Sequence, residues 1–172
     1  MATLAILVTG GAGAGKSDLA EKLAALLGSP VIAFDNVLED FADIAGPTVG
    51  RAALEPLAAS TGWSLAALVP NGVVVDVATF ASAAAGAATG ADRIVEIWCE
   101  VPAGEAALRI AGRERHPIHA VDAANPENPA HPDAEPSGLW PLLRVNTRVP
   151  VDFTTLLPAL AELLVDPETD TE

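Results

Sequence analysis

Short apolar runs alternate along the chain with segments in which apolar residues recur at helical spacing. The apolar runs read as strands buried in a parallel sheet, and they cover residues 4–9, 31–34, 73–76, 93–100 and 142–145. Helical patterns are predicted between and after them, over residues 16–27, 37–44, 51–59, 64–68, 78–89, 102–114 and 151–164. This alternation predicts one α/β domain over residues 1–172, with three layers and about five parallel strands between helices on both faces.

The junction between the first strand and the first helix carries the clearest motif. It has the pattern G-x-x-x-x-G-K-[ST], formed by Gly10, Gly11, Ala12, Gly13, Ala14, Gly15, Lys16 and Ser17. Glycines let backbone N–H groups turn toward a phosphate, and the start of a helix adds further unpaired donors. Lys16 is expected to reach the β- and γ-phosphates and the Ser17 hydroxyl to hold Mg²⁺, with Asp18 beside them at the nucleotide. The stretch predicts a nucleoside triphosphate site.

Composition excludes several kinds of protein. The formal charge of −14 argues against nucleic acid as a partner. No apolar run approaches the ~20 residues that span a bilayer, and no signal peptide is recognisable, so we expect no membrane partner. The single cysteine, Cys99, is expected to be a buried and inert thiol in a cytoplasmic protein.

Two carboxylates follow predicted strands. Because ligands of such sheets bind at the carboxyl ends of the strands, Asp35 and Asp76 are expected at the same edge as the glycine loop. Asp35 is a candidate general base that accepts the proton of an attacking hydroxyl, or else it caps the helix that follows. Asp76 is a candidate Mg²⁺ ligand, directly or through water, or a cap in its turn.

Three arginines precede a segment with four prolines, residues 125–138, which predicts a lid over about residues 109–138. Arg109 and Arg113 are four residues apart and are expected to share a helix face, whereas Arg115 points elsewhere. On a lid they would neutralise charge on a triphosphate; individually each is as readily a solvated surface charge. His116 and His119 are expected to contact substrate or to pack the loop rather than to bind a metal.

Two other classes with a glycine-rich phosphate loop fit poorly. GTPases need a lysine in an NKxD motif, and no lysine follows Lys22. AAA+ machines carry an Asp-Glu pair in the strand that bears the metal carboxylate, whereas Val77 follows Asp76.

Four stretches together resemble the small P-loop kinases, and among them the zeta-toxin-like and chloramphenicol-phosphotransferase-like families. They are GGAGAGKS at 10–17, VIAFD at 31–35, VVVDVATF at 73–80 and R-x-x-x-R-x-R-H-P from Arg109. The resemblance implies a sheet of strand order 2-3-1-4-5 that uses ATP and Mg²⁺. It implies phosphate binding by residues 10–17, Asp35 as the base, Arg113 and Arg115 in the lid, and Asn146 near the adenine. Related chains often carry Asp at position 146 and lack the long proline-rich insertion.

The expected function is therefore transfer of the γ-phosphate of ATP to a small-molecule hydroxyl, by a monomer or a homodimer. Lys16, Asp35, Arg113 and Arg115 are the candidate catalytic residues, with Arg109 and Asn146 among those that bind the nucleotide. The acceptor is expected between Asp35, residues 37–69 and the lid, where Arg51 and Glu55 are the main charged candidates. The alternatives are a regulatory ATPase without an acceptor and a toxin-type kinase of nucleotide sugars.

Overall fold

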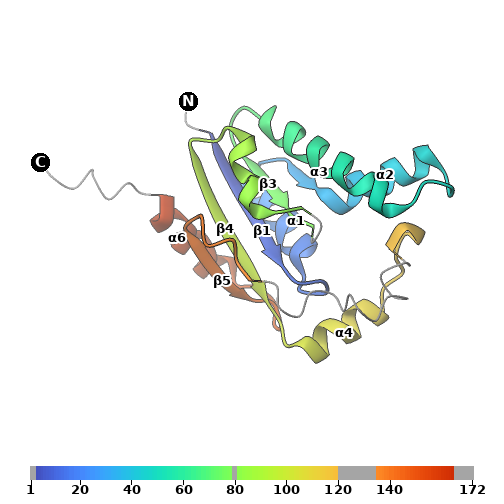
Figure 1. Cartoon of the computed structure of the whole chain (residues 1–172). Helices are drawn as coiled ribbons and strands as arrows, with labels where there is room; N and C mark the ends of the chain where they lie inside the picture. Colours follow the sequence, from blue (N-terminus) through green and yellow to red (C-terminus); the bar gives the residue numbers. More distant parts are fainter. Residues whose placement is uncertain (1–2, 79–80, 120–134, 165–172) are drawn as a thin grey trace, which may run out of the picture.

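A five-stranded parallel sheet forms the centre of the molecule (Figure 1). The computed structural model describes residues 3–78, 81–119 and 135–164. Its strands are β1 (Leu4–Gly10), β2 (Val31–Ala33), β3 (Val73–Asp76), β4 (Arg93–Glu100) and β5 (Leu142–Asn146). They are ordered β2-β3-β1-β4-β5, and every neighbouring pair is parallel, which confirms the predicted order 2-3-1-4-5.

Helices cover both faces of the sheet. They are α1 (Lys16–Leu27), α2 (Phe34–Ala45), α3 (Arg51–Ala67), α4 (Ala103–Ala111) and α6 (Phe153–Leu164), with the 3₁₀ turns η1 (Ala83–Thr89) and η2 (Pro117–His119). Side chains alternate along β1, so Ile6 and Val8 pack with α1 and α6, whereas Leu7 packs with α3. The three-layer α/β architecture is thus confirmed.

The second strand is shorter than its apolar run suggests. β2 ends at Ala33, and Phe34 begins α2 instead of ending the strand, so α2 starts three residues before the predicted position. Phe34 is fully buried, and its ring meets that of Trp63 edge to face, 4.8 Å between centroids. Because this burial is achieved from the first turn of a helix, Asp35 lies in that turn and not at a strand end.

Three other boundaries differ from the predictions. α3 is one continuous helix through Ala67, whereas two helices were predicted over 51–59 and 64–68. Within it the Ser64 hydroxyl donates to the carbonyl of Ser60 at 2.8 Å. Within the predicted helix over 78–89 the structure has a 3₁₀ turn from Ala83, capped by Ser82. α4 stops at Ala111, before Gly112, so the predicted helix over 102–114 is too long.

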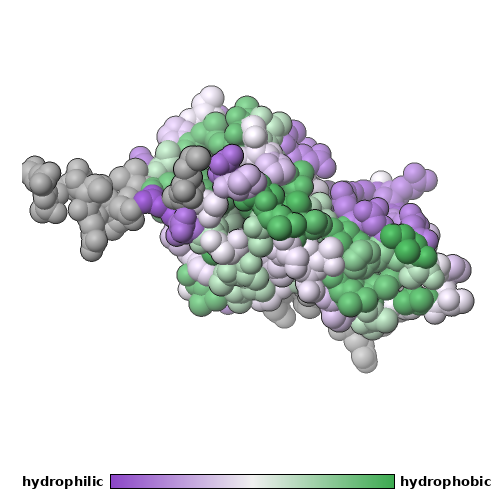
Figure 2. All heavy atoms as spheres, turned by 90° about the horizontal axis from the view of Figure 1, so that it is seen from above, coloured by the Kyte–Doolittle hydropathy of each residue, from purple (hydrophilic) through white to green (hydrophobic). Residues whose placement is uncertain are grey.

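The outer surface of α2 and α3 is partly apolar. Seen from above in Figure 2, hydrophobic residues gather on this side of the molecule, where Ile44, Leu57, Leu65 and Leu68 are 41–84 % exposed. Faces of this kind often mediate association, but the predicted monomer or homodimer stays a prediction. Among the described residues, no helix is long and apolar enough to cross a membrane. About half of the predicted lid, residues 120–134, and the acidic tail from residue 165 lie outside the described residues.

The contact between α3 and Phe34 provides a test of the packing. A Cβ added at Gly62 would lie 2.4 Å from a ring carbon of Phe34, which has no free volume to move into. We expect Gly62→Ala to lower the free energy of unfolding by about 1–3 kcal/mol, measured by urea denaturation. Gly104→Ala is the matched control, since Gly104 lies in α4 with nothing within 4 Å of its added Cβ. It should be neutral or slightly stabilising, and an equal loss in both variants would contradict this view of the core.

Candidate active site

The glycine loop is pressed against two other segments of the chain. Gly10 and Gly13 have φ angles of +139° and +75°, which side chains rarely allow. A Cβ on Gly10 would lie 2.7 Å from the carbonyl oxygen of Cys99, and one on Gly13 would lie 2.5 Å from that of Ala106. The loop backbone thus packs directly against the backbone at the end of β4 and in α4, and these contacts determine its shape.

Side chains from two distant segments hold the same loop. The Thr147 hydroxyl donates to the carbonyl of Ala14 at 2.6 Å. Arg109, on α4, donates to the carbonyl of Thr147 at 2.9 Å and to that of Gly13 at 3.5 Å, while it pairs with Glu105. Arg109 is thus a buttress of the predicted phosphate site. Thr147 was assigned no separate role from the sequence, because a threonine after a strand carries no distinctive signal.

Lys16 is folded back over the loop. It is 9 % exposed, and its ammonium donates to the carbonyl of Gly11 at 3.2 Å. A side chain held there is available to anionic oxygens that replace the carbonyl.

Asp76 and Ser17 form the inner wall of the site. Asp76 ends β3 at 4 % exposure, and the Ser17 hydroxyl hydrogen-bonds to its carboxylate. Burial raises the pKa of Asp76, against the opposing effects of the Lys16 charge and of the Ser17 hydrogen bond. Asp35 also raises this pKa and Arg113 lowers it, so four other functional candidates lie within electrostatic reach of Asp76.

These donors suit Mg²⁺. The ion prefers oxygen ligands, takes only one or two from the protein and keeps waters and phosphate oxygens as the others. A buried carboxylate beside a serine hydroxyl supplies that pair. Groups of three or more His, Cys, Asp or Glu side chains able to hold a metal by themselves are absent from the described part of the chain.

A cleft of about 440 Å³ opens beside Ser17 and Asp76. Asp35 lines it from α2, and Arg113 and Arg115 line it from the other side. α4 ends at Ala111, so these two arginines lie in the irregular segment after the helix and line the same cleft. Arg109, which is still in α4, contacts the phosphate loop instead. The predicted pairing of Arg109 with Arg113 on one helix face is therefore wrong.

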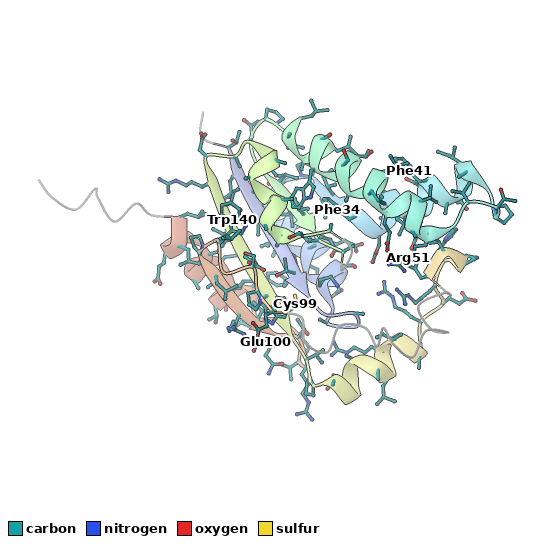
Figure 3. All side chains as sticks on the ribbon, viewed as in Figure 1. Phe34, Phe41, Arg51, Cys99, Glu100 and Trp140 are labelled. Carbon is teal, nitrogen blue, oxygen red and sulfur yellow. The ribbon has the colours of Figure 1, made fainter. Side chains whose placement is uncertain are left out.

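His119 fastens the segment that carries these arginines to α2 and α3. It is 3 % exposed, with Nε2 2.9 Å from Glu39 and Nδ1 3.3 Å from Arg51. His116 similarly approaches Asp43 at 3.1 Å. Figure 3 shows Arg51 between α3 and the η2 turn. Arg51 and Glu55 pair with each other and do not line this cleft, so their contact with an acceptor stays a prediction.

The remaining candidates lie at the edge of this arrangement. Asp18 is exposed on α1 and pairs with Lys22 at 2.8 Å. Asn146 ends β5, where its side-chain oxygen accepts from the backbone of Arg148 at 2.9 Å. Their contacts with a nucleotide stay predictions. Cys99 is buried as predicted, and burial raises the pKa of its thiol to about 12.

The chain matches no family model and no curated protein at a significant level. Solved structures do match. A candidate kinase from Chloroflexus aurantiacus has a TM-score of 0.69 at 18 % identity, over 95 % of this chain and 97 % of that one. A shikimate kinase from Bacteroides thetaiotaomicron has a TM-score of 0.55 at 18 % identity, over 94 % and 98 %. A sugar kinase from Janibacter has a TM-score of 0.54 at 16 % identity, over 99 % of both chains.

These likenesses show that the chain has the fold of P-loop kinases, and they extend over almost all of it. The narrower resemblance to the zeta-toxin-like and chloramphenicol-phosphotransferase-like families stays a prediction, since none of these three structures is named as a member of either family.

The raised pKa of Asp76 predicts that this residue costs stability. A carboxyl whose pKa is higher in the folded than in the unfolded chain loses stability as pH rises from the ordinary value of 3.8 through the raised one. We therefore expect Asp76→Asn to raise the urea midpoint of the ligand-free protein at pH 7 and to change it less as pH falls. Asp92→Asn, at an exposed carboxylate, is the control. A lower midpoint for Asp76→Asn at pH 7 would show that ionised Asp76 stabilises the fold.

Proposed function

We propose that this chain is an ATP-dependent phosphotransferase that moves the γ-phosphate to a hydroxyl of a small molecule. One observation carries the proposal above all. The predicted phosphate loop and the cleft share Ser17, and Asp35, Asp76, Arg113 and Arg115 line the same cleft. A donor site and an acceptor site therefore adjoin at one point, which is what direct transfer between two bound molecules requires.

The donor half is the loop with Lys16. Its backbone N–H groups and the start of α1 provide a positive end for the phosphates, while Lys16 neutralises charge that develops on the transferred group. Ser17 and Asp76 are the residues that would hold Mg²⁺, which would supply positive charge to offset that of the phosphates. Arg109 supports this half through its hydrogen bonds to the loop and to Thr147.

Asp35 is the proposed base of the acceptor half. In the described part of the chain its carboxylate has no hydrogen bond or ion pair, and α2 has no side-chain cap. The capping role that the sequence left open therefore lacks support, and the carboxylate is available to accept a hydroxyl proton. Arg113 and Arg115, for which the described residues likewise provide no ion pair, are placed to stabilise the phosphoryl group in transit.

The neighbouring structures favour a small acceptor. A shikimate kinase and a sugar kinase share the fold, and each name denotes phosphorylation of a small hydroxylated compound. We extend this class to the present chain, with ATP as the donor and with no role for nucleic acid in view of the acidic charge of −14. ADP release by the purified protein with Mg-ATP, measured across hydroxylated metabolites and antibiotics, tests the proposal. ADP release that no compound raises above the basal rate would favour the regulatory ATPase, and a response confined to nucleotide sugars would favour the toxin-type kinase.

Lys16→Ala tests the donor half. Loss of the ammonium should lower ATP turnover by about 100-fold or more, because a preorganised charge at the transferred phosphate is lost. Lys22→Ala is the control, since Lys22 is exposed on the same helix and pairs only with Asp18 among the described residues. Equal turnover in the two variants would overturn the assignment of the site.

Asp35→Asn tests the acceptor half. We expect phosphoryl transfer to fall by about 100- to 10,000-fold while the Kd for Mg-ATP changes little, because the base acts only on the acceptor. Transfer rates and nucleotide Kd are measured on the same preparation, with Asp92→Asn as the exposed control. Unimpaired transfer in Asp35→Asn would show that another group takes the proton.

A further inference from the structure

A second cavity lies on the same side of the sheet as α3, separate from the cleft of Asp35. It has a volume of about 320 Å³, within the range of small-molecule sites, and shares no lining residue with the first cleft. Thr9 and Gly10, at the end of β1, form part of its wall, so it adjoins the start of the phosphate loop. Glu96 and Trp98 line it from β4.

Glu96 is an unusual residue for the centre of a parallel sheet, where aliphatic side chains prevail. It is 1 % exposed. Its carboxylate accepts hydrogen bonds from the Thr9 hydroxyl at 2.7 Å, from the Ser137 backbone at 3.0 Å and from the Ser137 hydroxyl. Three donors directed at the two oxygens satisfy much of the hydrogen-bonding capacity of the carboxylate.

The described residues supply this carboxylate with hydrogen bonds but with no ion pair. All nine Lys and Arg residues lie in the described part of the chain, and none of the ion pairs described there includes Glu96. A buried anion without a counter-charge is costly. A cation brought by a ligand would remove that cost.

The rest of the cavity suits a cation attached to a compact apolar body. Trp98 lies two residues after Glu96 and therefore on the same face of β4, half-buried, where its ring can stack on a ligand or attract a cation. Trp98 is therefore not one of the buried core residues. Glu135 adds a second carboxylate at the exposed side, and Val77, Ala78 and Ala81 contribute small apolar surfaces.

We propose that this cavity binds a small amine, with its ammonium group against Glu96 and its apolar part against Trp98. Such a molecule has two possible relations to the proposed reaction. It is either the amine-bearing end of the phosphate acceptor or an effector that is not itself phosphorylated. The binding step is the same in both and does not depend on the proposed kinase activity.

Isothermal titration of the full chain with 2-phenylethylamine, 2-phenylethanol and 3-phenylpropionate tests the charge requirement. All three probes carry a 2-phenylethyl group, and its polar end is positively charged in the amine, neutral in the alcohol and negatively charged in the acid. We expect the amine to bind at least 10-fold more tightly than the alcohol, and the acid to bind more weakly still. Equal affinity for amine and alcohol, or no measurable binding of the amine, would overturn the proposal.

Variants locate the amine in the cavity. Glu96→Gln should weaken amine binding by 10-fold or more and leave alcohol binding nearly unchanged. Because loss of a buried carboxylate can impair folding, Glu135→Gln serves as a second variant at an exposed position, with an expected loss of about 3-fold. Glu100→Gln is the control on the same strand, since Glu100 pairs with Arg144 outside the cavity. Amine binding that is unchanged in both Glu96→Gln and Glu135→Gln would place the amine elsewhere and overturn the assignment.

The hydroxylated amine 2-amino-1-phenylethanol distinguishes an amine that is part of the phosphate acceptor from an amine that is an effector. Binding that is weakened in Glu96→Gln and accompanied by ADP release from Mg-ATP would identify the cavity as part of the acceptor site. Binding with the same dependence on Glu96 and no added ADP release would identify an effector site. Either result supports the amine site, and binding that ignores Glu96 overturns it.

Discussion

The close contact of the glycine loop with β4 and α4 is the constraint on which the rest of the site depends. At Gly10 and Gly13 the loop backbone approaches two carbonyl groups more closely than any Cβ would allow. That approach fixes the direction of the loop N–H groups before a ligand arrives, and preorganised donors stabilise charge without the cost of reorganisation. α4 contributes twice, because its backbone meets Gly13 and its Arg109 holds the carbonyl of the same residue. The segment with Arg113 and Arg115 follows directly from α4, so α4 supports both the shape of the phosphate loop and the position of these two arginines.

The same edge of the sheet carries a concentration of charge that the fold alone does not favour. Asp76 is buried with a raised pKa, and Asp35 lies near enough to raise it further. The positive charges of Lys16 and Arg113 offset part of the cost of burying these carboxylates. A bound metal ion would offset more of it, and the negative charge of a triphosphate would in turn be balanced by the metal ion and Lys16. Residues that cost stability in the free protein and suit a ligand are typical of functional sites.

Much of the fold followed from periodicity, and the failures have physical causes. Five strands and their parallel arrangement were predictable because buried runs such as Val73–Asp76 alternate with helical patterns. The start of α2 was not predictable, because an apolar residue such as Phe34 suits both a buried strand and a buried helix face. Its contact with Trp63 is made from the helix, and this contact cannot be read from the local sequence. The phosphate loop was predictable because its motif is local in sequence. Thr147, Glu96 and the network of His119 with Glu39 and Arg51 were not, since each joins residues more than 40 positions apart.

Glu96 and His119 are both buried polar residues near the carboxyl ends of the strands, but their surroundings suit different roles. His119 uses both ring nitrogens on partners from α2 and α3, so its polar groups are satisfied by the protein and it serves to hold η2 against those helices. Glu96 accepts hydrogen bonds but has no ion pair among the described residues, and it borders a cavity rather than a packed interface. Burial alone therefore does not separate a structural polar residue from a binding one. The presence or absence of a charged partner does, because hydrogen bonds can satisfy a polar group, whereas a carboxylate gains a counter-charge only from another charged group.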